Sequence, residues 1–590
     1  MRSPDRVAPA SLALALLAGL MLFVVSAWAE WALGAPMNGA PALALACGGV
    51  TWLLRATGHG LWTALRATGF LLLMAALAGV LGETVHDLSS DGQLYHQQAV
   101  LLMSQGWNPL HQPESTIDNW SKLWVDGYAK THWVYAALLT TLGFGIEAGK
   151  SFTWLLGLAG GLLAYALLTE RLAWSRRSAA AVSALAVLNP VFATEWPTYM
   201  NDHTLACMLM LLLLSLFWAA RAPALPAARR QAAALVMCSV ALLASVKASG
   251  VAYALVLLVL AAPLLVWACG MRAAVRLGAV AVAGLAFGVL VLGFNPYVTN
   301  TLGHGHPFHP LAGQAKVDII SNNVPAGVAE QTRLVKFFGS LAARSSSTLG
   351  GPVQPETLAP KLPGSVSVGE LKVFLTKNDV RIAGFGPWFS LALVVAAVGA
   401  VWAGLRRQST AGRRVLLLAP MALLMLSALA FPEPWWARYV PQVWLAPLAV
   451  AVALITSGRA DGDRPQRVVG WSIVAIAAAN AALVALLFVA GNLPRQLDYR
   501  TQLDSLKTLS NAAVLRVDVA HGPAQGRLFD DLGIRWQSAG MPAACPAGSA
   551  WVQIEYSHGR LCLDETQATV YVTQSPWVES VKRRLQGRQH

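Results

Sequence analysis

The chain has 590 residues, of which 56% are hydrophobic and only 12% are charged, and its mean hydropathy is +0.52. An ordinary soluble domain carries roughly 25% charged residues, so this composition excludes a soluble or an intrinsically disordered protein. The net charge of +14 does not indicate nucleic-acid binding, because most of the 43 Lys and Arg residues fall in short segments between apolar stretches.

Apolar stretches of about 20 residues, each long enough to cross a bilayer, recur along most of the chain. They predict thirteen membrane-spanning segments, at residues 10–29, 40–54, 66–82, 151–170, 178–194, 204–220, 231–246, 250–270, 276–294, 388–405, 415–431, 440–457 and 468–490. The sequence therefore predicts an all-α polytopic membrane protein.

The arginines predict its orientation. With the N-terminus in the cytoplasm, the loops assigned to the inside carry Arg2, Arg6, Arg55, Arg66, Arg171, Arg176, Arg177, Arg221, Arg229, Arg230, Arg272, Arg276, Arg406, Arg407, Arg413, Arg414, Arg459, Arg464 and Arg467. The short outside loops have almost none, and Arg438 is the notable exception. This asymmetry satisfies the positive-inside rule. It places residues 83–150, 295–387 and 491–590 outside, and we divide the chain into a membrane domain, 1–490, and a C-terminal extracytoplasmic domain, 491–590.

The C-terminal segment predicts a small α/β domain. Residues 551–556 and 569–573 alternate apolar and polar side chains as strands do, and residues 503–517 are compatible with a helix. Cys545 and Cys562 face an oxidising compartment in this topology, so we expect them to form a disulfide. No Cys/His spacing indicates zinc, and no phosphate-binding glycine motif is present.

The first outer loop combines several ionisable groups beside a membrane helix. Ser90 and Gln93 fit a capping box, which predicts a short helix that runs to about Met103 and places Asp91 and Tyr95 on one face. The Asp91 carboxylate then either stabilises the helix N-terminus or projects into a cavity as a general base. Asp87 is the alternative base.

Other outer segments carry charges that can meet Asp91. Asp202 begins a later membrane segment, where it either caps a helix or joins Asp91 in a site. Lys247 and Arg438 lie in outside turns, and reach either lipid headgroups or a bound anion. Two more cations come from the first outer loop, where Lys130 and His132 precede an apolar stretch, 133–145, that we expect to lie in the membrane interface. Together, carboxylates and cations at one face predict a site for a phosphorylated lipid and an acceptor hydroxyl.

Several short motifs resemble the GT-C superfamily of membrane glycosyltransferases, the class that contains the protein O-mannosyltransferases and the aminoarabinose transferases of lipid A. The resemblance spans about residues 66–457 and rests on these segments: Ser90-Asp91-Gly92-Gln93-Leu94-Tyr95-His96, Gly106-Trp107-Asn108-Pro109, Leu142-Gly143-Phe144-Gly145, Tyr199-Met200-Asn201-Asp202, Asn295-Pro296-Tyr297 and Trp436-Ala437-Arg438-Tyr439.

This resemblance implies an inverting transfer of a sugar from a polyprenyl-phosphate donor to a glycan, lipid or protein acceptor, at the periplasmic face of a bacterial inner membrane. It implies Asp91 as the base, with Asp202 as a second catalytic acid. The remaining candidate substrate-binding residues are Tyr95, His96, Lys130, His132, Lys247, Arg438 and Tyr439. Many relatives carry two adjacent acids in the first loop, whereas Gly92 follows Asp91 here. The sequence therefore leaves open whether the enzyme needs a divalent metal ion, and we assign no residue to metal binding.

Two other functions share part of this pattern. A transporter or flippase for a polyprenyl-linked glycan also needs charges at the outer face, but it is expected to carry ionisable residues inside its membrane helices, and residues 204–220 and 250–270 contain none. A ligase that moves a whole glycan shares the superfamily architecture and stays open.

Overall fold

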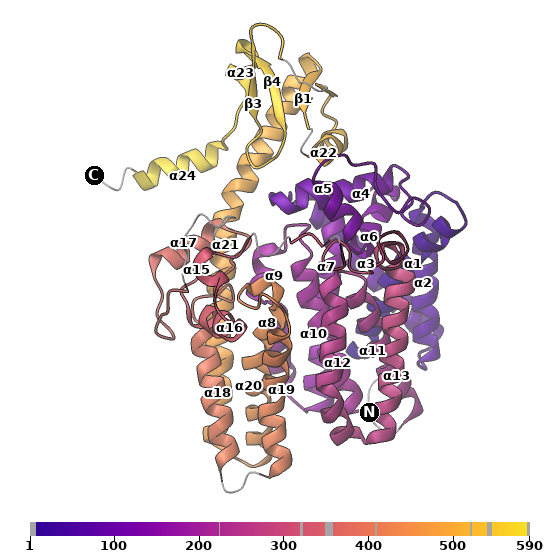
Figure 1. Ribbon diagram of the computed structural model, residues 1–590, viewed down its shortest axis with the longest axis vertical. Helices are drawn as coiled ribbons and strands as arrows, with labels where there is room; N and C mark the ends of the chain where they lie inside the picture. Colours follow the sequence, from indigo (N-terminus) through magenta and orange to yellow (C-terminus); the bar gives the residue numbers. More distant parts are fainter. Residues whose placement is uncertain are drawn as a thin grey trace.

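The computed structural model describes residues 7–222, 225–314, 316–318, 323–347, 358–406, 410–519, 522–539 and 545–586 (Figure 1). Within these ranges, ten helices are long and apolar enough to cross a membrane. They are α1 (Pro9–Ala32), α2 (Gly39–Ala56), α3 (Leu61–Glu83), α7 with its flanking turns η2 and η3 (Ile146–Arg171), α10 (Asp202–Ala220), α11 (Pro226–Ala244), α12 (Ala248–Cys269), α13 with η4 (Met271–Leu292), α20 with η8 (Pro441–Ala460) and α21 (Arg464–Ala512). The chain is a multi-pass membrane protein.

Three predicted spans differ from these ten. Two of them, α18 (Phe389–Leu405) and α19 (Ala411–Leu429), are apolar helices, of which α18 has 17 residues. The third, predicted at 178–194, is wrong as a single helix, because it is broken into α8 (Arg176–Val187) and α9 (Pro190–Glu195). Pro190 has no N–H to continue a helix, and the Asn189 side chain caps the new one by accepting from the Val191 N–H at 3.0 Å. Three arginines used to predict the orientation, Arg2, Arg6 and Arg407, lie outside the described residues.

The membrane helices form two groups with separate buried cores (Figure 1). The first group contains α1, α2, α3, α7 and α10 to α13, and the second contains α18 to α21 together with α8. An apolar groove of about 430 Å³ lies where the groups meet, lined by side chains of α7, α10 and α12 on one side and α19 and α20 on the other. Its lining extends to Arg221 and Ala460, at the ends of α10 and α20 that lie away from the C-terminal domain.

The first outer loop folds over one end of the first group. It contains η1 (Gly92–His96), α4 (Gln97–Ser104), α5 (Ser121–Gly127) and α6 (Thr131–Thr141). With 11 residues, α6 is too short to cross a bilayer, as predicted. Every residue from 131 to 139 is buried within the protein, so this stretch packs against other segments of the chain.

The second outer loop lies against both groups: its first part contacts the first group, and its later helices contact α18, α19 and α21. Its elements are η5 (Phe294–Val298), α14 (Thr299–His304), α15 (Ala326–Ala329), α16 (Arg333–Ala342) and α17 (Val368–Thr376), and the turn η7 (Ala437–Tyr439) lies after α19. A small core that includes Ile382, Trp435 and Trp436 joins the second outer loop to the segment before η7. Residues near 380 are thereby held beside Arg438.

The C-terminal domain is a four-stranded sheet with helices, as predicted in outline (Figure 1). The strands β1 (Leu515–Asp518), β2 (Trp536–Ser538), β3 (Ser549–Gln553) and β4 (Arg560–Asp564) lie in the order β2-β1-β4-β3. The helices are α22 (Ala524–Leu532), α23 (Glu565–Val570) and α24 (Pro576–Gln586). A disulfide joins Cys545 to Cys562 of β4, with their Cα atoms 5.7 Å apart.

Two predicted elements of this domain differ from the structure. No strand forms at 569–573: its first two residues end α23, which begins at a capping box of Asp564 and Gln567, and the other three are irregular. The helix expected at 503–517 is the last part of α21, which ends at Ala512 and is followed by β1.

The long helix α21 connects the membrane domain to the sheet. Its 49 residues correspond to about 74 Å at 1.5 Å per residue, more than twice the roughly 30 Å hydrocarbon core. Tyr499, Leu503, Leu506 and Leu509 on its last turns pack into the core of the C-terminal domain. The predicted domain boundary at 490 therefore falls inside a continuous helix, and the C-terminal domain is attached through a rigid element.

Candidate functional site

Arg438 of η7 lies at the centre of a cluster of charges at the end of the helices that carries the C-terminal domain. Its guanidinium is 3.6 Å from a carboxylate oxygen of each of Asp91, Asp202 and Asp379. These acids come from the start of η1, the first residue of α10 and the segment between α17 and α18. Four segments distant in sequence thus meet at one point.

The guanidinium is surrounded by carboxylates without a tight contact to any of them. Charge-assisted N–H···O bonds are usually about 2.7–2.9 Å long, so contacts of 3.6 Å leave its donors available. Within the described residues its Nε has no hydrogen-bond partner. Burial opposes the charge, but Asp379 and Asp202 outweigh it and raise the pKa of Arg438. The side chain is a permanent cation, and its Nε–H is unpaired within the part of the chain that the structure describes.

Lys247, which immediately precedes α12, belongs to the same cluster. Its ammonium donates to the Asp202 carboxylate at 2.6 Å and lies 5.3 Å from the centre of the Tyr439 ring. Burial opposes its charge, yet the pKa of Lys247 is raised because the Asp202 carboxylate outweighs that effect. The Asp202 side chain, which is only 4% exposed, is therefore already paired with Lys247.

Asp91 is the accessible acid of the cluster, with a side chain 38% exposed. The predicted capping box is wrong. The Gly92 N–H donates to Ser89 Oγ at 3.1 Å, whereas the Gln93 amide donates to the carbonyls of Asp87 and Tyr556. With the first turn capped by Ser89, the Asp91 carboxylate faces Arg438 and solvent.

Asp87 has a different environment. It is 1% exposed, and its carboxylate accepts from the Ser89 N–H at 2.8 Å and from the Tyr199 N–H at 2.6 Å. Burial, together with the nearby Glu147 carboxylate, raises the pKa of Asp87 to about 7. The residue joins the first outer loop to the segment before α10, which is a structural role, and its carboxylate is closed to an acceptor.

Lys130 and His132 are not arranged as phosphate-binding cations. The Lys130 ammonium is fully buried, where it donates to the carbonyls of Asp126 and Tyr128. Burial lowers the pKa of Lys130 to about 7 and that of His132 to about 3. Their inclusion among the phosphate ligands is therefore wrong for this conformation.

Aromatic and imidazole side chains form the wall below the cluster. Tyr95 and His96 are buried, and the Tyr95 ring stacks on Trp124 and Tyr128 with centroids 5.6 and 5.9 Å away. Burial and the charges nearby lower the pKa of His96 well below its ordinary value, so the ring is neutral. Tyr439 contacts both cations through its ring face, with Arg438 at 5.4 Å.

Three residues of the site were not among the predicted ones. Asp379 contacts Arg438 and accepts from Trp436 Nε1 at 2.8 Å, while Arg381 contacts Asp379 at 3.2 Å and lies over the Trp436 ring. Glu195 is buried and accepts from the His203 N–H, and burial raises its pKa. The sequence does show an acid and a base, Asp379 and Arg381, on either side of Val380 in the second outer loop. Nothing in the sequence, however, connects this pair to Arg438.

The residues present do not form an evident metal site. Among the residues that the structure describes, no group of three His, Cys, Asp or Glu side chains is arranged to hold a metal ion. Arg438 occupies the point at which the three aspartates converge.

No protein-family model, no curated protein and no solved structure matches this chain.

Proposed function

We propose that the protein is a membrane glycosyltransferase of the GT-C type, which transfers a sugar from a polyprenyl-phosphate donor to an acceptor hydroxyl. The observation that carries this proposal is the position of Arg438, whose guanidinium lies 3.6 Å from the exposed Asp91 carboxylate and whose Nε–H has no hydrogen-bond partner among the described residues. A general base next to an anion-binding guanidinium is what displacement of a phosphate by a hydroxyl requires.

In the proposed reaction, Asp91 takes the proton of the acceptor hydroxyl as its oxygen bonds to the anomeric carbon of the sugar. The bond between that carbon and the phosphate oxygen breaks, and polyprenyl phosphate leaves with the bonding electrons. Arg438 stabilises the developing negative charge through charge-assisted hydrogen bonds. Lys247 pairs with Asp202, and Asp202 in turn contacts Arg438 and helps to position it.

The apolar groove between the two helix groups supports a lipid donor. Its lining is almost entirely aliphatic and lies within the membrane helices. An isoprenoid chain gains free energy by leaving water for such a surface. We propose that part of the polyprenyl chain occupies this groove while its phosphate reaches Arg438.

The proposal includes the topology. Thirteen crossings, with α8 and α9 together making one, place the N-terminus in the cytoplasm of a bacterium and the charge cluster in the periplasm. The clustering of loop arginines on one side supports this orientation.

The replacement Asp91→Asn tests the proposal most directly. Amide and carboxylate have the same size, but the amide cannot accept the proton, so we expect sugar transfer to fall by about 10²–10⁴-fold. The purified protein is incubated with polyprenyl phosphates carrying mannose, glucose, galactose, arabinose or aminoarabinose, with a bacterial envelope extract as acceptor source. Mass spectrometry measures the polyprenyl phosphate released.

Asp118→Asn is the matched control, since Asp118 is an exposed acid of the same outer loop. It is expected to keep wild-type activity. Near wild-type transfer by Asp91→Asn contradicts the role of Asp91 as the base. Donor that stays intact with the wild-type protein, while being moved across a vesicle membrane, indicates a transporter instead.

A further inference from the structure

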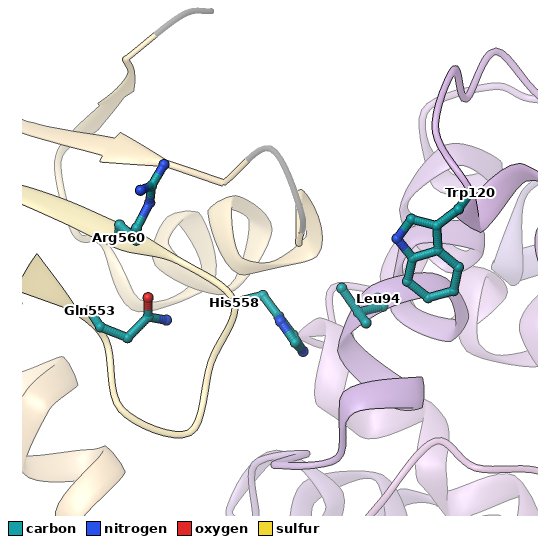
Figure 2. A pocket seen from close by; sticks show the side chains of 5 residues that line it. All are labelled: Leu94, Trp120, Gln553, His558 and Arg560. Atoms are coloured by element: carbon teal, nitrogen blue, oxygen red, sulfur yellow. The ribbon is translucent and has the colours of Figure 1, made fainter. Parts of the chain in front are cut away.

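A second cavity lies outside the charge cluster, between the first outer loop and the C-terminal domain. It has a volume of about 440 Å³ and is lined by Leu94 and Trp120 on one side and by Gln553, His558 and Arg560 on the other (Figure 2). This volume is within the range of about 300–1,000 Å³ that is usual for small-molecule sites. None of these residues was a predicted site residue.

The cavity exists because the C-terminal domain docks on the outer loop. The Gln93 amide donates to the Tyr556 carbonyl at 2.9 Å, and Ser90 Oγ lies 3.3 Å from His558 Nε2. Both contacts involve the turn between β3 and β4. The cavity wall is therefore composed of two parts of the chain more than 400 residues apart in sequence.

The lining combines one exposed aromatic face with several hydrogen-bonding groups. The Trp120 side chain is 52% exposed, which is high for an indole that belongs to a folded loop. Across the cavity stand an amide, an imidazole and a guanidinium; the Gln553 amide also donates to the Ser557 carbonyl at 2.8 Å, and Arg560 is paired with Asp518. A neutral, hydroxyl-rich ligand with an apolar face suits this lining, because the indole takes the C–H face and the polar groups bind the hydroxyls.

The cavity adjoins the exposed acid of the charge cluster. Ser90, which contacts His558, immediately precedes Asp91, and Leu94 of the lining lies on the next turn of the same short helix. The cavity is thus lined and bordered by neighbours of Asp91 in the chain, although Asp91 itself does not line it.

We propose that this cavity, defined by Leu94, Trp120, Gln553, His558 and Arg560, binds a carbohydrate, and that the acceptor of the reaction is therefore a glycan. The identification as an acceptor site rests on the proposed function, whereas carbohydrate binding does not. A peptide that added a strand to the sheet would bind through backbone hydrogen bonds along the edge strand β3. The lining here consists of side-chain groups.

The experiment measures glycan binding by the full-length protein in detergent micelles. An array of soluble bacterial core and O-antigen oligosaccharides selects the best probe, and calorimetry gives its dissociation constant. Trp120→Ala is expected to weaken binding about tenfold or more, as for an aromatic group at the centre of an interface, whereas Trp120→Phe retains most of it. Trp577→Ala is the matched control, because Trp577 is 53% exposed on α24 and is expected to bind like the wild type.

Each outcome has a distinct meaning. Failure of every oligosaccharide to bind, an unchanged affinity in Trp120→Ala, or tighter binding of a Ser/Thr-rich peptide that depends on Trp120 overturns the carbohydrate site. Oligosaccharide binding that depends on Trp120 in a protein that turns over no polyprenyl-phosphate sugar supports the site and contradicts the transferase. Thermal melting of each variant shows whether it is folded.

Discussion

At the scale of single residues, the environment of each charge separates its role from those of its neighbours. Asp87 and Asp91 are four residues apart. The Asp87 carboxylate is buried and accepts hydrogen bonds from two backbone N–H groups, whereas the Asp91 carboxylate is exposed beside Arg438. Lys130 and Lys247 differ in the same way, since one ammonium contacts carbonyl groups and the other a carboxylate. Residue type alone therefore does not identify the site.

Arg438→Met is expected to weaken the binding of undecaprenyl phosphate about tenfold or more. The replacement keeps much of the side-chain bulk but removes the guanidinium, and a hydrogen bond to a charged group contributes about 1.5–3 kcal/mol. Native mass spectrometry of the purified protein with added undecaprenyl phosphate measures this affinity. Arg381→Met is the control, because Arg381 also contacts Asp379 and Trp436. If both variants lose the same affinity for undecaprenyl phosphate, the loss reflects the removal of a positive charge in general and not a specific role of Arg438.

Asp87 makes stability depend on pH. The pKa of the folded carboxyl is raised from its ordinary value of 3.8 to about 7, so between these values the folded protein holds a proton that the unfolded chain has lost. The stabilising effect of the protonated form is complete below about pH 4 and is lost as pH rises toward 7. The slope is about 1.4 kcal/mol per pH unit.

The comparison with Asp87→Asn isolates this effect, because the amide does not titrate. Melting temperatures measured from pH 4 to pH 8 are expected to fall with pH more steeply for the wild type than for the variant. Parallel curves for the two proteins contradict the raised pKa.

At the scale of elements, the short helix η1 positions Asp91, and its first residue has to be a glycine. A Cβ atom on Gly92 would lie 1.8 Å from the Asp87 carboxylate. An acidic side chain at position 92 therefore has no room. The buried Asp87 and the small residue at 92 are two parts of one packing arrangement.

Gly92→Ala is accordingly expected to destabilise the protein by about 1–3 kcal/mol, the usual cost of overpacking, and to reduce transfer by displacing Asp91. Thermal melting and the release of polyprenyl phosphate measure the two effects. Gly303→Ala in α14 is the control, as its added methyl group meets no atom within 4 Å. Wild-type stability of Gly92→Ala is incompatible with the close contact to Asp87.

At the scale of the whole molecule, two helix groups and the C-terminal domain enclose the candidate sites. The groove lies between the groups, the charge cluster combines Asp91 and Lys247 with Asp379 and Arg438, and the glycan cavity lies under the C-terminal domain. Lipid, phosphate and acceptor would thus each bind at a boundary between parts of the fold, where side chains of different origin meet.

The disulfide is expected to stabilise the C-terminal domain without being required for chemistry. Bridging residues 17 apart in sequence restricts the unfolded chain, which corresponds to about 3 kcal/mol in the chain-entropy model. Replacing Cys545 and Cys562 by Ser should make the domain more sensitive to limited proteolysis while transfer continues. If the denatured, unreduced wild-type protein can be alkylated at both cysteines, the disulfide is absent and the prediction is contradicted.

Much of the architecture is predictable because it depends on local sequence. A stretch of about 20 apolar residues crosses a bilayer wherever it occurs, and ten such helices lie at predicted positions. The alternation in residues 551–553 likewise predicts part of β3. Prediction failed where a single local contact decides the outcome, as with Asn189 and Pro190 between α8 and α9, or where period-two alternation was outweighed by the capping box of α23.

The sequence by itself determined that this is a polytopic membrane protein with acids and cations in its outer loops, because hydropathy and charge are properties of the residues themselves. Only the tertiary structure decided which of these charges meet. Asp379 reaches Arg438 through a core that includes Trp436, and Lys130 is removed from the cluster by complete burial. Contacts and burial depend on segments tens to hundreds of residues apart, and no local pattern in the chain specifies them.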